Sequence, residues 1–133
     1  MKNTKLLLIV TAMVAALATG ANAGPREDII AGFTNQGAGA PNPASGEKMF
    51  NTVFGTGKPD TPGCTTCHGK DPHQSGQTRT GKSIDPMAVS KTPDRFTDKA
   101  KVDKWFLRNC QGVIGRECTA QEKVDFISFM MTQ

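Results

Sequence analysis

The sequence lacks the residue patterns that build the common zinc and nucleic-acid sites. It contains two histidines and four cysteines. A structural zinc site needs a second close ligand pair, and neither another close cysteine pair nor a histidine pair accompanies Cys64 and Cys67. Basic residues are interleaved with acidic ones, as Lys101 and Lys104 are with Asp103, so no basic stripe suited to a nucleic acid is present. These absences argue against a zinc site and against nucleic-acid binding.

A long apolar run is also missing. The longest run, residues 6–18, has 13 residues, fewer than the roughly 20 that a membrane-spanning helix needs. Two lysines precede it and Ala21-Asn22-Ala23 follows it, which is the pattern of an export signal with a small-residue cleavage site. We therefore predict that residues 1–23 are a cleaved signal peptide. Residues 24–133 are expected to form one domain in the periplasm, with no membrane insertion after cleavage.

The rest of the chain is organised around Cys64-Thr65-Thr66-Cys67-His68. Two thiols at this spacing can add to the two vinyl groups of one porphyrin, and the adjacent imidazole can reach the iron from one face. A thioredoxin-like redox pair would need a strand-helix context and would have no use for a histidine directly after Cys67. The pattern predicts one covalently bound haem c per chain, with Cys64 and Cys67 as thioether positions and His68 as the proximal iron ligand.

Apolar spacing predicts an all-α domain. We expect helices over residues 25–36 and 47–54, a third that begins at Thr97 as N-cap, and a last one over residues 119–131. Thr119 and Glu122 have the spacing of a capping box at the start of this last helix. One face of the third helix carries residues at i, i+3, i+4 and i+7, namely Val102, Trp105, Phe106 and Asn109.

Residues 69–97 contain glycine, proline and polar residues with almost no apolar spacing, so they are predicted to be a long irregular loop. A loop of this length is unusual in a small domain unless something replaces the missing core. A porphyrin can do so, because an irregular chain can lie along its edge and bind its propionates. Arg79 and Lys82 are the candidate propionate contacts.

Cys110 and Cys118 are predicted to form a disulfide. The signal directs the chain to an oxidising compartment, and these two thiols are the ones left once haem has taken the other pair. Closing so short a loop stabilises a fold by about 2–3 kcal/mol in the chain-entropy model.

The sixth ligand of the iron decides between functions, and three residues compete for it. Met87 would raise the reduction potential and produce an electron carrier. His73 lies five residues after His68, too close for the two to reach opposite faces easily, and is expected on the surface. Asn109 would be a weak, displaceable oxygen ligand, although an asparagine there is also suited to capping the end of its helix.

Several motifs resemble the sphaeroides haem protein family of high-spin class I cytochromes c. The pentad at 64–68 is shared by many cytochromes, whereas Trp105-Phe106-Leu107-Arg108-Asn109-Cys110 and Gly115-Arg116-Glu117-Cys118-Thr119 are more specific. Residues 76–82 and 92–97 fit the same pattern. The resemblance covers essentially the whole predicted mature chain.

This resemblance implies a class I cytochrome c fold of about four to five helices around one haem. It implies that Asn109 is the distal iron ligand, that it leaves the iron on reduction, and that oxygen, nitric oxide, carbon monoxide or a similar small molecule then binds. We expect that ligand beside Val102, Trp105 and Phe106. The family's electron donor is a dihaem cytochrome c.

Two other hypotheses stay open. One is an ordinary electron-transfer cytochrome c with Met87 as the sixth ligand. The other is an enzyme that turns over the bound gas, for example by oxidising nitric oxide with bound oxygen, although no acid-base pair near the iron can be named from the sequence.

Overall fold

The computed structural model describes residues 23–133, which fold into five helices and one two-stranded sheet. Of the predicted export signal, residues 1–22 lie outside the described part. No helix between residues 23 and 133 is both long and apolar enough to span a membrane. The elements, in chain order, are α1 (Pro25–Thr34), α2 (Pro43–Asn51), α3 (Thr65–His68), β1 (Gly76–Gln77), β2 (Ser83–Ile84), α4 (Lys99–Val113) and α5 (Ala120–Met131).

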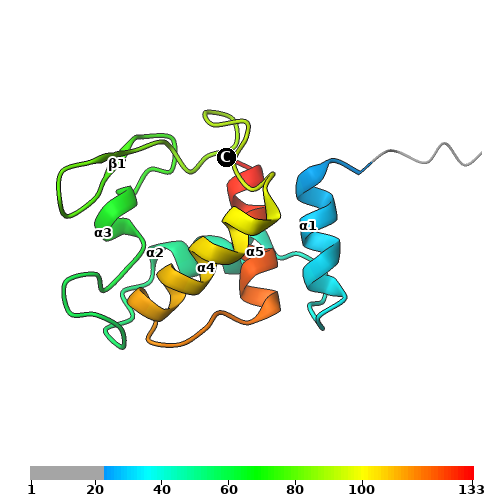
Figure 1. Cartoon of the computed structure of the whole chain (residues 1–133), viewed down its shortest axis with the longest axis horizontal. Helices are drawn as coiled ribbons and strands as arrows, with labels where there is room; N and C mark the ends of the chain where they lie inside the picture. Colours follow the sequence, from blue (N-terminus) through cyan, green and yellow to red (C-terminus); the bar gives the residue numbers. More distant parts are fainter. Residues whose placement is uncertain (1–22) are drawn as a thin grey trace, which may run out of the picture.

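Helices α4 and α5 form the middle of the molecule, with α1 on one side and α3 with β1 on the other (Figure 1). Every residue of α5 from Val124 to Met130 is buried. Phe106 of α4 packs edge-to-face against Phe33 of α1 and Phe126 of α5, with ring centroids 6.4 and 5.7 Å apart. Such aromatic pairs add stabilisation beyond the area they bury, so one aromatic cluster joins three helices.

Helix α2 begins four residues earlier than predicted, inside a stretch expected to be loop. Asn42 is its N-cap and accepts a hydrogen bond from Ser45 N at 3.2 Å, and Pro43 occupies the first helical position. The buried Asp125 carboxylate accepts from Asn42 N at 2.9 Å and from Gln121 Nε2 at 2.7 Å. A contact with α5 thus fixes the start of α2.

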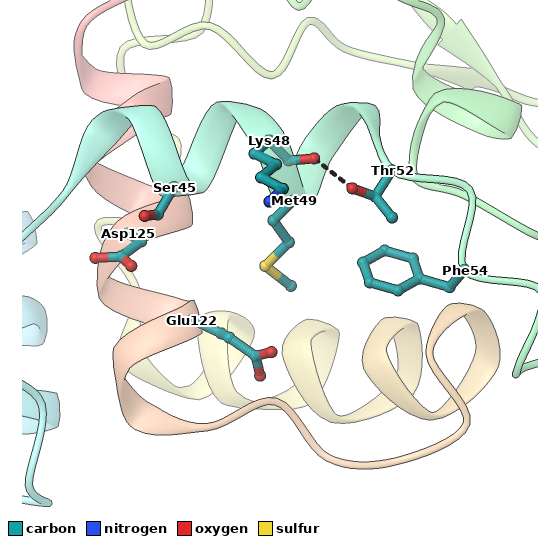
Figure 2. A pocket seen from close by; sticks show the side chains of 7 residues that line it. All are labelled: Ser45, Lys48, Met49, Thr52, Phe54, Glu122 and Asp125. Carbon is teal, nitrogen blue, oxygen red and sulfur yellow. Dashed lines mark hydrogen bonds between the residues drawn. The ribbon is translucent and has the colours of Figure 1, made fainter.

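Close approach of α2 and α5 requires a glycine. A Cβ at Gly46 would lie 2.1 Å from the carbonyl oxygen of Asp125, which no side chain tolerates. Figure 2 shows this crossing, with Ser45 of α2 beside Asp125 of α5.

Helix α4 begins one residue later than predicted and continues past Asn109. Asp98, not Thr97, is the N-cap and accepts from Lys101 N at 3.0 Å, whereas the Thr97 hydroxyl donates to Asp94 O. The helix continues one turn past Asn109 and ends at the C-cap Ile114. The alternative role of Asn109 as a helix cap is therefore wrong.

Residues 69–97 are mostly irregular, as predicted, but contain the short antiparallel pair β1–β2, with Gly76 opposite Ile84. Two backbone bonds hold the middle of this segment. Ala88 N donates to Pro72 O at 2.9 Å, and Val89 N donates to Met130 O at 3.0 Å. The loop that carries Met87 is thereby tied both to the chain just after His68 and to the end of α5.

The predicted capping box of α5 is present, since Glu122 N donates to the Thr119 hydroxyl and Thr119 N donates to the Glu122 carboxylate. Replacing Thr119 by alanine is expected to lower the free energy of unfolding by about 1 kcal/mol, because one cap bond to a helix N–H is lost. Urea unfolding measures the change. Thr34→Ala, an exposed threonine at a helix C-terminus, is the control; equal midpoints for the two variants would contradict the prediction.

Candidate functional site

A cavity of about 770 Å³ lies between α3, the irregular segment after it, and α4. Its volume is within the range of roughly 300–1,000 Å³ found for sites that enclose small molecules. The predicted site residues lining it are Cys64, Cys67, His68, Arg79, Lys82, Met87, Val102, Trp105, Phe106 and Asn109. The structure therefore brings together, around one space, residues separated by up to 45 positions in the sequence.

One wall of the cavity is the single turn of α3. His68 N donates to Cys64 O at 3.1 Å, and Gly69, with a φ of +70°, ends the turn in a left-handed conformation suited to glycine. Both thiols are unpaired and partly buried. Burial raises the pKa of the Cys64 thiol to about 11, so this group is a neutral thiol at neutral pH.

The His68 imidazole lies on the same wall. Burial, and then the positive charge of Arg95, lower its pKa to about 4. The ring is thus neutral at neutral pH, the form in which an imidazole nitrogen can bind iron. The backbone of β1 packs tightly behind it, since a Cβ at Gly76 would lie 2.9 Å from His68 Cα.

The opposing structural element is α4. Val102 and Phe106 are 6% and 9% exposed and form an apolar surface, whereas Trp105 and Asn109 are exposed and border the cavity. This helix therefore presents the Asn109 carboxamide beside an apolar surface, and its basic residues Lys101 and Arg108 also line the cavity.

The end of α4 is held from two directions. The predicted disulfide between Cys110 and Cys118 is present and buried, with its Cα atoms 5.6 Å apart. The loop before the pentad closes over the last turn, because Lys58 N donates to Gly112 O at 2.7 Å. A Cβ at Gly57 would lie 2.2 Å from that same Gly112 oxygen, so only glycine fits there. The residue next to Asn109 is thus immobilised.

Comparison with known proteins identifies the family. A family model described as a domain of unknown function (DUF1924) matches residues 36–130. The chain is 50% identical to the cytochrome c-type protein SHP of Cereibacter sphaeroides over 127 residues, which are 95% of this chain and 97% of the relative. The chain belongs to this family, the SHP-type cytochromes c. It is also 35% identical to cytochrome c'' of Methylophilus methylotrophus over 95 residues, 71% of this chain and 66% of that one.

Solved structures agree on the fold. The structure of oxidised SHP, described as an oxygen-binding cytochrome c, superposes with a TM-score of 0.78 at 49% identity, covering 83% of this chain and 97% of that chain. The crystal structure of oxidised cytochrome c'' gives a TM-score of 0.69 at 30% identity, covering 82% and 94%. The predicted cytochrome c fold and family are confirmed. The prosthetic group of this SHP-type cytochrome is covalently attached haem c.

The cavity of this SHP-type cytochrome fits such a group. Two thiols and a neutral imidazole are adjacent on one turn, α4 contributes the buried apolar side chains of Val102 and Phe106, and several basic side chains also line the cavity. Among residues 23–133, no three histidine, cysteine or acidic side chains gather as a metal cluster would require. Donors and space therefore suit a porphyrin held by thioethers.

Other predicted residues are placed as follows. Arg79 forms an ion pair with Asp60 on the surface, and Lys82 is exposed; both border the cavity. His73 lies outside the cavity lining and its Nδ1 is 2.9 Å from the Asp71 carboxylate, as expected for a surface residue. Met87 is 8% exposed and reaches the cavity.

Sequence reasoning missed Arg95. Its Nε donates to Pro86 O at 3.0 Å and one terminal nitrogen donates to Asp85 O at 2.5 Å, and its side chain borders the cavity. No periodicity or spacing separates it from the other basic residues. The one pointer was its place inside the segment Thr92–Thr97, which matches the family pattern.

A second, smaller hollow of about 320 Å³ lies between α2 and α5 (Figure 2). Its carboxylates are already bound, since Asp125 accepts from Asn42 and Gln121 and Glu122 pairs with Arg116. It contains no thiol or imidazole, and we assign it no function.

Proposed function

We propose that this protein is an exported monohaem cytochrome that binds small ligands at its iron after reduction. Cys64 and Cys67 hold the haem, His68 is the proximal iron ligand, and Asn109 is a weak sixth ligand that a small molecule replaces. The haem supplies an iron that accepts one electron and takes a diatomic ligand such as oxygen, nitric oxide or carbon monoxide. Side chains of the protein hold the haem, provide the displaceable ligand and enclose the small molecule.

The observation that carries this proposal is the position of Asn109. Its carboxamide borders the same cavity as His68, it comes from a different element, and it caps no helix end. Val102 and Phe106, on the same face of α4, are buried and form an apolar surface. The Asn109 side chain is exposed at the edge of this cavity, so its carboxamide oxygen is available to bind an iron atom there.

A carboxamide oxygen is a suitable ligand for a gate driven by reduction. It is a hard donor, which binds ferric iron better than the softer ferrous iron. Asn109 is therefore expected to bind in the oxidised protein and to swing away in the reduced protein. Val102, Trp105 and Phe106 would then enclose the incoming ligand and exclude water.

Met87 is the competing ligand, because its sulfur also reaches the cavity. The loop that carries Met87 is held by two backbone hydrogen bonds. Ala88 N is bonded to Pro72 O, four residues beyond His68, and Val89 N is bonded to Met130 O. These bonds fix the loop that carries Met87 between the segment after His68 and the end of α5, and the spectra of the Met87 and Asn109 variants decide between the two ligands.

The relatives agree with this proposal. SHP is described as an oxygen-binding cytochrome c, and a solution structure of cytochrome c'' is described as giving insight into haem-ligand detachment. Both descriptions concern those proteins. For this chain we propose the same kind of displaceable ligand, location in the periplasm, and reduction by a dihaem cytochrome c.

Absorption spectra of Asn109→Ala and Met87→Leu test the ligand assignment. Asn109→Ala is expected to change the ferric spectrum, because the sixth ligand is lost, and Met87→Leu is expected to leave it nearly unchanged. The reduced wild-type protein is expected to be high-spin and to bind carbon monoxide readily. A low-spin reduced form that refuses carbon monoxide, or a ferric spectrum that responds to Met87→Leu alone, would leave an ordinary electron carrier.

A further inference from the structure

Arg95 is fixed at the wall of the haem cavity by neutral groups. Its guanidinium donates to the carbonyl oxygens of Asp85 and Pro86, and Pro86 O also accepts from the Thr92 hydroxyl at 2.8 Å. Its own carbonyl accepts from Arg26 Nε of α1 at 2.7 Å. The side chain and its backbone are therefore both held in place.

The positive charge of Arg95 is not neutralised by these contacts. Carbonyl oxygens orient a guanidinium but carry no net charge. Five ion pairs occur between residues 23 and 133, and Arg95 takes part in none of them. Asp85 and Asp94 also border the cavity, but neither forms an ion pair with Arg95. Arg79, by contrast, is paired with Asp60.

Arg95 and His68 border the same cavity, and the loop that Arg95 grips is bonded through Ala88 to the chain just after His68. A fixed charge acts more strongly in a partly buried site than in water, because the effective dielectric constant is lower. The charge of Arg95 thus lies at the wall of the cavity that suits the haem.

We propose that Arg95 sets the reduction potential of this haem and so the poise at which Asn109 is released. Reduction transfers one electron from a donor cytochrome, whose own haem is oxidised, and lowers by one the positive charge that Arg95 faces. Arg95 therefore repels the ferrous site less than the ferric one and favours reduction. This role rests on the proposed function only in its link to Asn109; Arg95 acts as a positioning and electrostatic residue and touches no reacting ligand.

Redox titration of the holoprotein at low salt tests the proposal. Arg95→Gln is expected to raise the ratio of ferric to ferrous protein at least threefold at a fixed poise, which is about 28 mV at about 59 mV per tenfold. Arg95→Lys keeps the charge and is expected to keep most of the potential. Lys91→Gln removes one charge from an exposed residue outside the cavity and is expected to shift the ratio much less.

Two results would overturn the proposal: an Arg95→Gln potential equal to wild type, or equal shifts in the Gln and Lys variants, which would indicate lost structure rather than lost charge. The shift in potential on removing the Arg95 charge is expected whichever residue is the sixth ligand, because it is the electrostatic effect of one charge at the cavity wall. Carbon monoxide binding by the reduced wild-type protein tests the proposed function, and the redox titration tests the role of Arg95 separately.

Discussion

Replacing both Cys64 and Cys67 by alanine is expected to abolish covalent haem attachment. The two thiols are unpaired, lie on one turn and border the cavity, so they are positioned to form both thioether bonds. Without them, His68 remains as one coordinate bond, which unfolding breaks. Haem is expected to separate from the denatured double variant in acidified organic solvent and to stay with denatured wild type.

The matched control is Cys110→Ala with Cys118→Ala, which also removes two cysteines but leaves the pentad intact. This variant is expected to keep its haem through denaturation, as judged by the mass of the unfolded chain. If the Cys64 and Cys67 double variant also retained haem mass, attachment through these thiols would be disproved.

Covalent chemistry explains why the haem pentad could be read from sequence. Two thioethers and one adjacent imidazole require a fixed spacing that tertiary contacts cannot alter. The capping box of α5 is equally local, because Thr119 and Glu122 satisfy each other's backbone groups within one turn. The capping box was predicted correctly, whereas the N-cap of α4 is Asp98 and not the neighbouring Thr97.

Features that depend on distant residues were not predicted correctly. The start of α2 needs the contact between Asn42 N and Asp125, 83 residues apart, so its Asn-Pro start signal was lost within a glycine- and proline-rich stretch. The continuation of α4 past Asn109 was not predicted, because Lys58 and Thr56 come from another loop to satisfy the carbonyls of Gly112 and Ile114. The last carbonyls of a helix have no partner within that helix.

In the candidate site, too, some residues could be predicted from the sequence and others could not. The family pattern led to Asn109, but apolar periodicity alone left it as either a cap or a ligand, and the length of α4 decided against the cap. Arg95 had no local signal, since its importance comes from two carbonyls nine and ten residues earlier and from an absent ion-pair partner. A residue whose role depends on the loop folded around it is visible only in three dimensions.

Removing the disulfide with Cys110→Ala and Cys118→Ala is expected to have the largest effect on stability. The bond closes a loop across a sequence separation of 8, and its loss lowers the free energy of unfolding by about 2–3 kcal/mol in the chain-entropy model. Both sulfurs are buried in the core, so poor repacking would add to the loss. Urea unfolding of the holoprotein measures the change, and an unchanged midpoint would contradict it.

The same variant should also loosen the residue beside Asn109. Cys110 is anchored by the disulfide, and the next turn of α4 is held by Lys58 N on Gly112 O. With one of these two constraints removed, the Asn109 carboxamide is expected to bind the iron less uniformly, and the ferric spectrum should move toward that of Asn109→Ala. Combining the variants discriminates: if Asn109 is the ligand, adding Asn109→Ala to the disulfide variant leaves little further spectral change. If the two changes instead add in full, the disulfide acts on the spectrum through some residue other than Asn109.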